Sequence, residues 1–175
     1  TYKGQNVHDI LSMTVDDALL FFAPPEGTKP PAILRRLMAK LQPLHEVGLG
    51  YIALGQGSNT LSGGEAQRIK LAAFLARGDR QGHTLFVFDE PTTGLHVHDV
   101  AKLLDSFDAL LLQGHSVVVI EHHLDIIKCA DWVIDLGPQG GQDGGQLVHA
   151  GTPESLAQNV QSLTGKHLQP KLRQT

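Results

Sequence analysis

The stretch LFVFDE at residues 85–90 is a short apolar run that ends in two adjacent carboxylates, Asp89 and Glu90. A run of this length predicts a buried strand. In open α/β sheets, ligands bind beyond the carboxyl ends of the strands, so both acids would stand where chemistry takes place. One carboxylate could hold Mg²⁺, and the other could orient or deprotonate an attacking water. A solvated strand end, where acidic residues are common, is the alternative that LFVFDE alone leaves open.

The residues downstream of this run alternate between helical and strand patterns. A helix is predicted from 99 to about 113, with an apolar face made of Val100, Leu103, Leu104, Phe107 and Leu110. The β-branched run at 117–120 is typical of a parallel strand that is covered on both sides. Further strands are predicted at 132–136 and, after a turn at 140–145, at 146–150 as a sheet edge. Strand–helix alternation of this kind indicates an α/β layered fold.

The octapeptide LSGGEAQR at 61–68 places a serine and two glycines at a helix start near Ser62 or Gly63. Such a start exposes backbone N–H groups and the positive end of the helix dipole, and glycines let a phosphate approach closely. The plain alternative is an ordinary N-cap with Glu65 in the first turn. A lone Ser-Gly-Gly would be a weak signal, whereas the full octapeptide is specific.

The first third of the chain has a helical pattern. Thr14 and the acidic residues after it resemble a capping box, and the helix they predict has an apolar face made of Ala18, Leu19, Phe21 and Phe22. A loop rich in Pro and Gly follows at 23–31. A second amphipathic helix is predicted from about Ala32, and Pro43 should kink or end it. Residues 48–57 are predicted to form a turn region around a short apolar piece.

The strand predicted at 117–120 runs directly into Glu121 and His122. A histidine at a strand end can donate a hydrogen bond to a phosphate oxygen, and it titrates near neutral pH. The chain has ten histidines, and a lone histidine is usually structural or solvated, so the position after the strand is what favours a role. Neither the pair at 96 and 98 nor the pair at 122 and 123 has the i, i+4 spacing of a helical zinc motif.

Composition limits the class of protein. The chain has 175 residues, of which 41% are hydrophobic and 18% charged, as is typical of a soluble globular protein. The single cysteine, Cys129, excludes an internal disulfide and a cysteine-based zinc site, and it weakly favours a reducing cytoplasm. No apolar run approaches the roughly 20 residues of a membrane-spanning helix. The net charge of -4 argues against a surface that is basic overall but leaves a local basic stripe for nucleic acid open.

Three motifs follow one another in a familiar order, namely LSGGEAQR at 61–68, LFVFDEP at 85–91 and VVVIEH at 117–122. They resemble the signature, Walker B and switch-histidine motifs of ABC-type ATPases. DEPTTGLH at 89–96 and IEHHLDIIKCADWVIDLGP at 120–138 closely resemble the UvrA family of excinuclease proteins. The leader at 2–22 resembles the tail of the insertion in the second ATPase domain of that family. The resemblance therefore extends over nearly the whole chain.

This resemblance implies catalytic roles at three positions. Asp89 would hold Mg²⁺ through water. Glu90 would position or activate the water that attacks ATP. His122 would contact the γ-phosphate. ATP and Mg²⁺ are thus the expected cofactors, and apart from Mg²⁺ at Asp89 no metal site is expected in the chain.

The resemblance also implies residues that act on a second nucleotide. The ATP site of the opposing ATPase domain would be completed by Ser62, Gly63, Gly64 and Gln67. Residues 93–96, which include Gly94 and His96, would form the D-loop. Most transport ATPases end this loop in Asp, so the role of His96 stays open.

A phosphate-binding loop of the form GxxxxGK[ST] does not occur in the sequence, because Gly165-Lys166 is followed by His167. Without such a loop we expect no tight ATP binding and no hydrolysis by this chain alone. The zinc modules of the UvrA family use cysteine pairs, which would lie upstream of Thr1. The chain also has no initial Met, so we expect it to begin inside a larger protein.

The resemblance implies a C-terminal portion of an ABC-type P-loop ATPase domain, residues 61–175, preceded by the helical tail of an inserted signature domain, residues 1–60. The full-length protein would recognise DNA damage in bacterial nucleotide excision repair. It would be a cytoplasmic homodimer of the SOS response that binds damaged duplex DNA and a UvrB-type excinuclease partner, with no membrane partner. The rival functions are a nucleotide-binding component of an ABC transporter, a non-catalytic paralogue and a UvrA-like resistance protein. The long leader disfavours the first, and the intact catalytic set disfavours the second.

Overall fold

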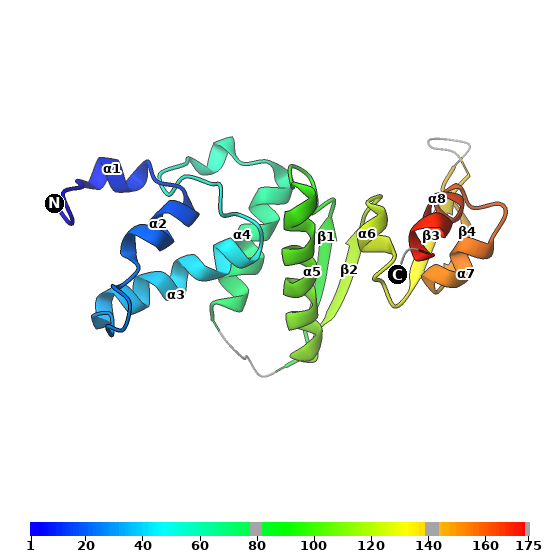
Figure 1. The fold of residues 1–175 in the computed structure, drawn as a ribbon. Coiled ribbons are helices and arrows are strands. Elements are labelled where there is room, and N and C mark those ends of the chain that lie inside the picture. Colours follow the sequence, from blue (N-terminus) through cyan, green and yellow to red (C-terminus); the bar gives the residue numbers. More distant parts are fainter. Residues whose placement is uncertain (78–81, 139–143, 174–175) are drawn as a thin grey trace. The chain divides into compact units, whose positions relative to one another are not determined.

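The computed structural model describes residues 1–77, 82–138 and 144–173 (Figure 1). The chain divides into two compact units, Thr1–Ile120 and Glu121–Thr175, and each is described by itself. The domain boundary predicted after residue 60 falls inside the first unit and stays a prediction. Within the described ranges, no helix combines the length and apolarity needed to cross a membrane.

Side-chain caps start the first helices of unit 1. The short helix α1 (Val7–Leu11) begins at Asn6, whose side chain accepts hydrogen bonds from the next backbone N–H groups. The predicted capping box is confirmed at α2 (Val15–Phe22), where the Thr14 hydroxyl accepts from the Asp17 N–H and the Asp17 carboxylate accepts from the Thr14 N–H. These local contacts fix both helix starts. A buried cluster between α2 and α3 is made of Val15, Ala18, Phe22 and Leu41.

The third helix, α3 (Ala32–Glu46), begins at the predicted residue but continues past Pro43. Proline lacks the N–H that the helical ladder needs, which costs about 3 kcal/mol in a helix interior. Pro43 is buried here, and Val47 and Leu49 just after the helix are fully buried. Packing of this segment into the core therefore outweighs the lost hydrogen bond, and of the two outcomes predicted for Pro43, a kink or a helix end, the helix end does not occur.

The centre of unit 1 is a parallel strand pair. Strands β1 (Leu85–Asp89) and β2 (Ser116–Ile120) pair so that Leu85 lies opposite Ser116 and Asp89 opposite Ile120. They are connected by α5 (Val97–Leu112), which begins two residues earlier than predicted. The predicted apolar face of α5 is confirmed, since Val100, Leu103, Phe107 and Leu110 are buried and Leu104 is partly buried. Helix α4 (Gly63–Leu75), which follows the 3-10 turn η1 (Ser58–Thr60), packs Leu71 and Ala72 into the same core.

Only one face of this sheet is covered, contrary to the prediction that β2 is buried on both sides. Phe86, Phe88, Val117 and Val119 pack into the core. The alternate residues of both strands are between 48% and 61% exposed, namely Leu85, Val87, Val118 and Ile120. Their β-branched and apolar character is that of a strand covered on both faces. Among the described residues of unit 1, however, helices pack against one face only.

Unit 2 contains a separate antiparallel pair. Strands β3 (Val133–Gly137) and β4 (Gln146–Gly151) pair with Val133 opposite Gly151 and Gly137 opposite Gln146. Both strands were predicted to within a residue or so, and they pair with each other. The turn predicted at 140–145 lies largely outside the described residues.

Three helices of unit 2 were not predicted. They are α6 (Leu124–Ile127), α7 (Pro153–Gln158) and α8 (Leu163–Leu172). Thr152 caps α7 and Pro153 is its first residue, which is a common helix start. Helices α7 and α8 approach so closely that a β-carbon at Gly165 would overlap the carbonyl oxygen of Leu156. Gly165 therefore serves helix packing.

Candidate functional site

The acid pair lies where β1 ends. Asp89 is the last residue of the strand, and Glu90 follows with a φ of 46°, in the left-handed region. A left-handed non-glycine residue costs roughly 1–2 kcal/mol, and such residues occur preferentially at functional sites. The Glu90 N–H donates to the carbonyl of Ile120 at 2.9 Å, which extends the β1–β2 pairing by one residue. Both acids are exposed, so the strand presents two adjacent carboxylates at its carboxyl end.

A tight turn continues from the acids to α5. The Thr93 N–H donates to the Glu90 carbonyl at 3.1 Å, and the Leu95 N–H donates to the Thr92 carbonyl at 2.9 Å. Gly94 has a φ of 79°, a conformation that favours glycine. His96 occupies the N-cap position of α5 and is exposed, but its side chain makes no capping hydrogen bond. The predicted D-loop is therefore an ordered turn with the His96 side chain at its surface.

The signature octapeptide forms a capped helix start. Ser62 is the N-cap of α4, and its hydroxyl accepts from the Glu65 N–H at 3.3 Å. In return, the Glu65 carboxylate accepts from the Ser62 N–H at 2.7 Å. The ordinary N-cap interpretation is thus correct. It does not exclude the phosphate role, because the Ser62 hydroxyl proton remains available to a second acceptor.

The two glycines of the octapeptide have different surroundings. Gly63 is exposed, and a β-carbon there would meet nothing within 4 Å. Gly64 is buried, and a β-carbon there would lie 3.2 Å from the Thr93 carbonyl oxygen and 3.3 Å from that of Glu90. These two neighbours are main-chain atoms, and a third neighbour is a guanidinium nitrogen of the buried Arg68 side chain at 3.3 Å. Gly64 therefore lets α4 pack on the turn after the acids, and only Gly63 lies on the open side.

Alanine at the two positions should have opposite effects on stability. Gly63→Ala is expected to leave the free energy of unfolding unchanged or to raise it by up to about 1 kcal/mol, because alanine is the better helix former. Gly64→Ala is expected to lower it by about 1–3 kcal/mol, because the turn must shift. Urea unfolding of both variants, followed by circular dichroism, measures the difference. Equal stability would mean that α4 does not pack tightly on residues 90–93.

Gln67 contacts the acid-bearing strand directly. Its amide nitrogen donates to the Asp89 carbonyl at 3.0 Å, and its amide oxygen accepts from the Asp89 N–H at 3.1 Å. The side chain thus satisfies both main-chain groups of Asp89. The sequence suggested Gln67 as a contact to the opposing ATP. That role stays a prediction, and in this structure the amide is bonded to the strand end of its own unit.

Arg68 is fully buried, at 0% exposure. One guanidinium nitrogen donates to the carbonyls of Pro91 and Thr93, the latter at 3.3 Å. The other donates to the Tyr51 hydroxyl at 3.4 Å. Burial lowers the pKa of Arg68, and the nearby Tyr51 and Glu65 oppose this shift. Sequence analysis did not single out Arg68 or Tyr51, although an arginine in an apolar helix, one turn after a capping box, was an available signal.

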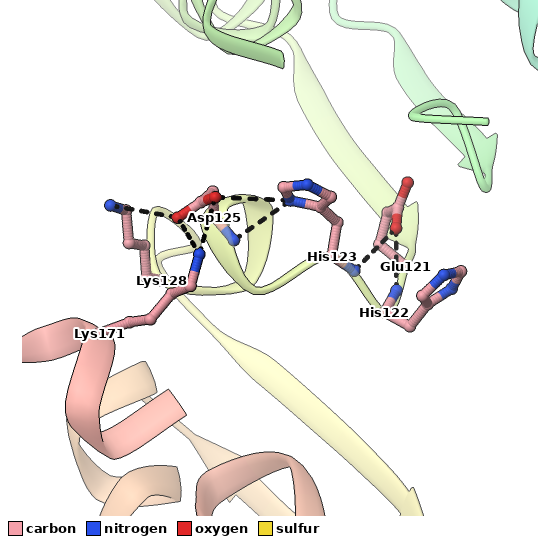
Figure 2. A network of polar contacts seen from close by, with 6 residues as sticks. All are labelled: Glu121, His122, His123, Asp125, Lys128 and Lys171. Atoms are coloured by element: carbon pink, nitrogen blue, oxygen red, sulfur yellow. Dashed lines mark hydrogen bonds and ion pairs between the residues drawn. The ribbon is translucent and has the colours of Figure 1, made fainter. Parts of the chain in front are cut away.

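His122 lies in unit 2, in the segment that precedes α6 (Figure 2). One carboxylate oxygen of Glu121 accepts from the His122 N–H at 2.9 Å and from the His123 N–H at 3.0 Å. The His123 ring nitrogen accepts from the Asp125 N–H at 3.3 Å, which caps α6. These bonds order the backbone on both sides of His122, whose side chain is exposed. That His122 acts on the same ATP as Asp89 and Glu90 stays a prediction.

Helix α6 is tied to α8 through Asp125 (Figure 2). The Lys171 ammonium lies 3.0 Å from both carboxylate oxygens of Asp125, and that of Lys128 lies 3.5 Å from one of them. The hydrogen bond from Lys171, followed by the charges of both lysines, holds the pKa of Asp125 below its usual value. The segment that carries His122 is thus followed by a helix that is anchored inside its own unit.

Metal-ligand clusters are absent from the part of the chain that the structure describes, where no three His, Cys, Asp or Glu side chains gather closely enough to hold an ion. Cys129 is exposed.

Comparison with known proteins places these motifs in a family. The chain is 58% identical over 173 residues to UvrABC system protein A of Aquifex aeolicus, which covers 99% of this chain and 18% of that protein. The crystal structure of UvrA2 from Deinococcus radiodurans is 44% identical and superposes with a TM-score of 0.75, covering 97% of this chain and 20% of that one. No protein-family profile matches the chain.

A more distant likeness identifies the fold alone. The structure of a bacterial Atm1-family ABC exporter with ATP bound superposes with a TM-score of 0.51 at 19% identity, covering 93% of this chain and 26% of that one. The mixed α/β architecture is accordingly that of part of an ABC ATPase domain. The chain spans less than a fifth of the length of the curated relative from Aquifex aeolicus. By its sequence identity to that relative and its structural likeness to UvrA2, the chain belongs to the UvrA family.

Proposed function

We propose that the chain is the C-terminal part of the second ABC-type ATPase domain of a UvrA-type protein that hydrolyses ATP at composite sites. The observation that carries this proposal is the exposed acid pair at the end of β1, with Glu90 in the left-handed region and Asp89 bonded on both main-chain groups by Gln67. A pair of carboxylates at a strand's carboxyl end suits nucleotide chemistry in α/β folds.

The acid pair fits Mg²⁺ and ATP by the chemistry of its donors. Bound Mg²⁺ would neutralise charge that develops on the phosphates. Asp89 would hold the ion through water, because Mg²⁺ keeps several waters and takes one or two carboxylates. Glu90 would orient and deprotonate the attacking water, and His122 would donate a hydrogen bond to the γ-phosphate.

The signature turn would act on the nucleotide of the opposing ATPase domain. Ser62 and Gly63 lie at the open start of α4, where helix N–H groups favour a phosphate. Gly64 and Gln67 would support this surface from behind, through their contacts to residues 89–93. Gly94 and His96 would form the D-loop, next to the start of α4 and to residues 89–93.

The whole protein would recognise damaged duplex DNA in nucleotide excision repair and pass it to a UvrB-type excinuclease partner. It would act as a cytoplasmic homodimer, in the SOS response, with ATP hydrolysis governing DNA engagement. Its zinc modules would lie outside this chain. Membership of the UvrA family supports these proposals, since the matching relatives are named UvrABC system protein A.

A comparison of the full-length protein with the isolated chain tests the proposal. The full-length protein should hydrolyse Mg-ATP and bind ultraviolet-damaged duplex DNA more tightly than undamaged duplex. The isolated 175-residue chain should fold but show no turnover and no micromolar Mg-ATP binding, because the GxxxxGK[ST] loop is missing from its sequence. Phosphate release measures turnover, and calorimetric titration measures the binding of Mg-ATP and of the two duplexes. Micromolar binding by the isolated chain, or equal affinity of the full-length protein for both duplexes, would contradict the proposal.

A further inference from the structure

Tyr51 connects two parts of the candidate site through one hydroxyl group. The hydroxyl donates to one carboxylate oxygen of Glu65 at 2.6 Å and accepts from the Arg68 guanidinium at 3.4 Å. Its pKa is raised, first by burial of the hydroxyl and then by the hydrogen bond to Glu65. The residue as a whole is 46% exposed, so apolar packing explains little of its placement.

Glu65 and Arg68, the two partners of the hydroxyl, each bond to a different segment of the candidate site. The other carboxylate oxygen of Glu65 accepts from the Ser62 N–H at 2.7 Å, so Glu65 links Tyr51 to the signature turn. The hydrogen bond from Tyr51 is the largest cause of the lowered pKa of Glu65. Arg68 donates to the carbonyls of Pro91 and Thr93, so it links Tyr51 to the turn that follows the acid pair.

The backbone around Tyr51 is held by the start of α2. The Val15 N–H donates to the Ile52 carbonyl at 2.9 Å, and the Asp16 N–H donates to the Gly50 carbonyl at 3.0 Å. These bonds flank Tyr51 on both sides. The residue is therefore fixed to the N-terminal helices while its hydroxyl reaches the signature helix.

We propose that Tyr51 is a positioning residue for both nucleotide sites, joining the signature turn at Ser62 to the acid-bearing turn at 90–93. Its hydroxyl holds Glu65 and Arg68 in one arrangement. A shift of either turn is then transmitted to the other, and a movement of the N-terminal helices reaches both. This inference rests on the proposed function, and it adds a residue outside the three ATPase motifs.

Tyr51→Phe in the full-length protein tests the inference, because it removes the hydroxyl and keeps the ring. Turnover should be measured in two backgrounds, each with the phosphate-loop lysine of one ATPase domain disabled. Loss of a hydrogen bond to a charged group should lower kcat about tenfold in both backgrounds, while KM for ATP changes less than about threefold. Tyr2→Phe is the matched control, because Tyr2 is 40% exposed and packs through its ring on Phe21 and Phe22. It should leave kcat unchanged.

The possible results separate the two proposals. Unchanged kcat in Tyr51→Phe, or a loss in one background only, would overturn the role of Tyr51 while leaving the ATPase function intact. Absence of ATP turnover in the wild-type full-length protein would overturn both. If Tyr51→Phe does not fold, Glu65→Gln takes its place, since the glutamine oxygen can still accept from the Ser62 N–H but bonds the tyrosine more weakly. A parallel fall of kcat in both backgrounds would then support the inference, and unchanged kcat would overturn it.

Discussion

In the full-length protein, Glu90→Gln is expected to lower ATP turnover at the site of this acid pair by about 10²-fold or more, as for loss of a general base. The substitution is nearly isosteric, and the main chain at position 90 can keep its bond to Ile120. Asp89 remains to hold Mg²⁺. The affinity for ATP should therefore change by no more than about a few fold, so the substitution should act by lowering kcat. Single-site turnover together with calorimetric ATP titration measures both quantities.

A matched control for this variant is Glu26→Gln. Glu26 is exposed in the loop between α2 and α3, so the same change of charge occurs far from the motifs in sequence. It should leave turnover unchanged. Wild-type turnover in Glu90→Gln would remove Glu90 from the mechanism, and an equal loss in both variants would trace the effect to charge alone.

Gly63→Asp is expected to abolish turnover at the site of the opposing ATPase domain. In the proposed composite site it would place a carboxylate against a phosphate in a poorly solvated contact, where like charges repel strongly. Gly63 is the position to change, because a β-carbon there meets nothing within 4 Å. The same substitution at Gly64 would also displace the main chain of Glu90 and Thr93, and so mix a structural effect with the electrostatic one. Turnover of Gly63→Asp, with Gly63→Ala as the uncharged control, measures the effect.

Features fixed by neighbouring residues could be predicted from the sequence. The capping box at Thr14 and the N-cap at Ser62 each involve a residue three positions later, so a short window contains the whole interaction. The apolar face of α5 and the strand at 85–89 follow from periodicity and length. The fold class and the family resemblance rest on such local patterns, and both are confirmed by the comparisons.

Features that depend on distant packing could not be predicted. The continuous apolar run at 117–120 suggested burial on both faces, but one face is exposed. Periodicity also could not tell that β3 and β4 pair with each other. Pro43 is tolerated because the segment around it is buried, which a propensity rule does not include.

The features of the candidate site also divide into those that could be predicted from the sequence and those that could not. Asp89, Glu90 and Ser62 were predicted from motifs, because residue type and spacing carry the chemistry, and their roles stay predictions. The bonds from Gln67 to Asp89 and from Arg68 to Thr93 join residues more than 20 positions apart, and no local pattern indicates them. The difference between Gly63 and Gly64 likewise emerges only when α4 packs on the turn after the acids.

The most direct test of the composite arrangement measures turnover of Gly63→Asp and of Glu90→Gln in full-length protein. Each substitution is combined with loss of the phosphate-loop lysine of one ATPase domain at a time. With the loop of this chain's own domain disabled, Gly63→Asp should abolish the remaining turnover and Glu90→Gln should change it little. With the opposing loop disabled, the pattern should reverse, because in the proposed arrangement the two residues serve different nucleotides. If both substitutions instead abolish turnover in the same background and spare it in the other, the composite arrangement proposed for this chain is wrong.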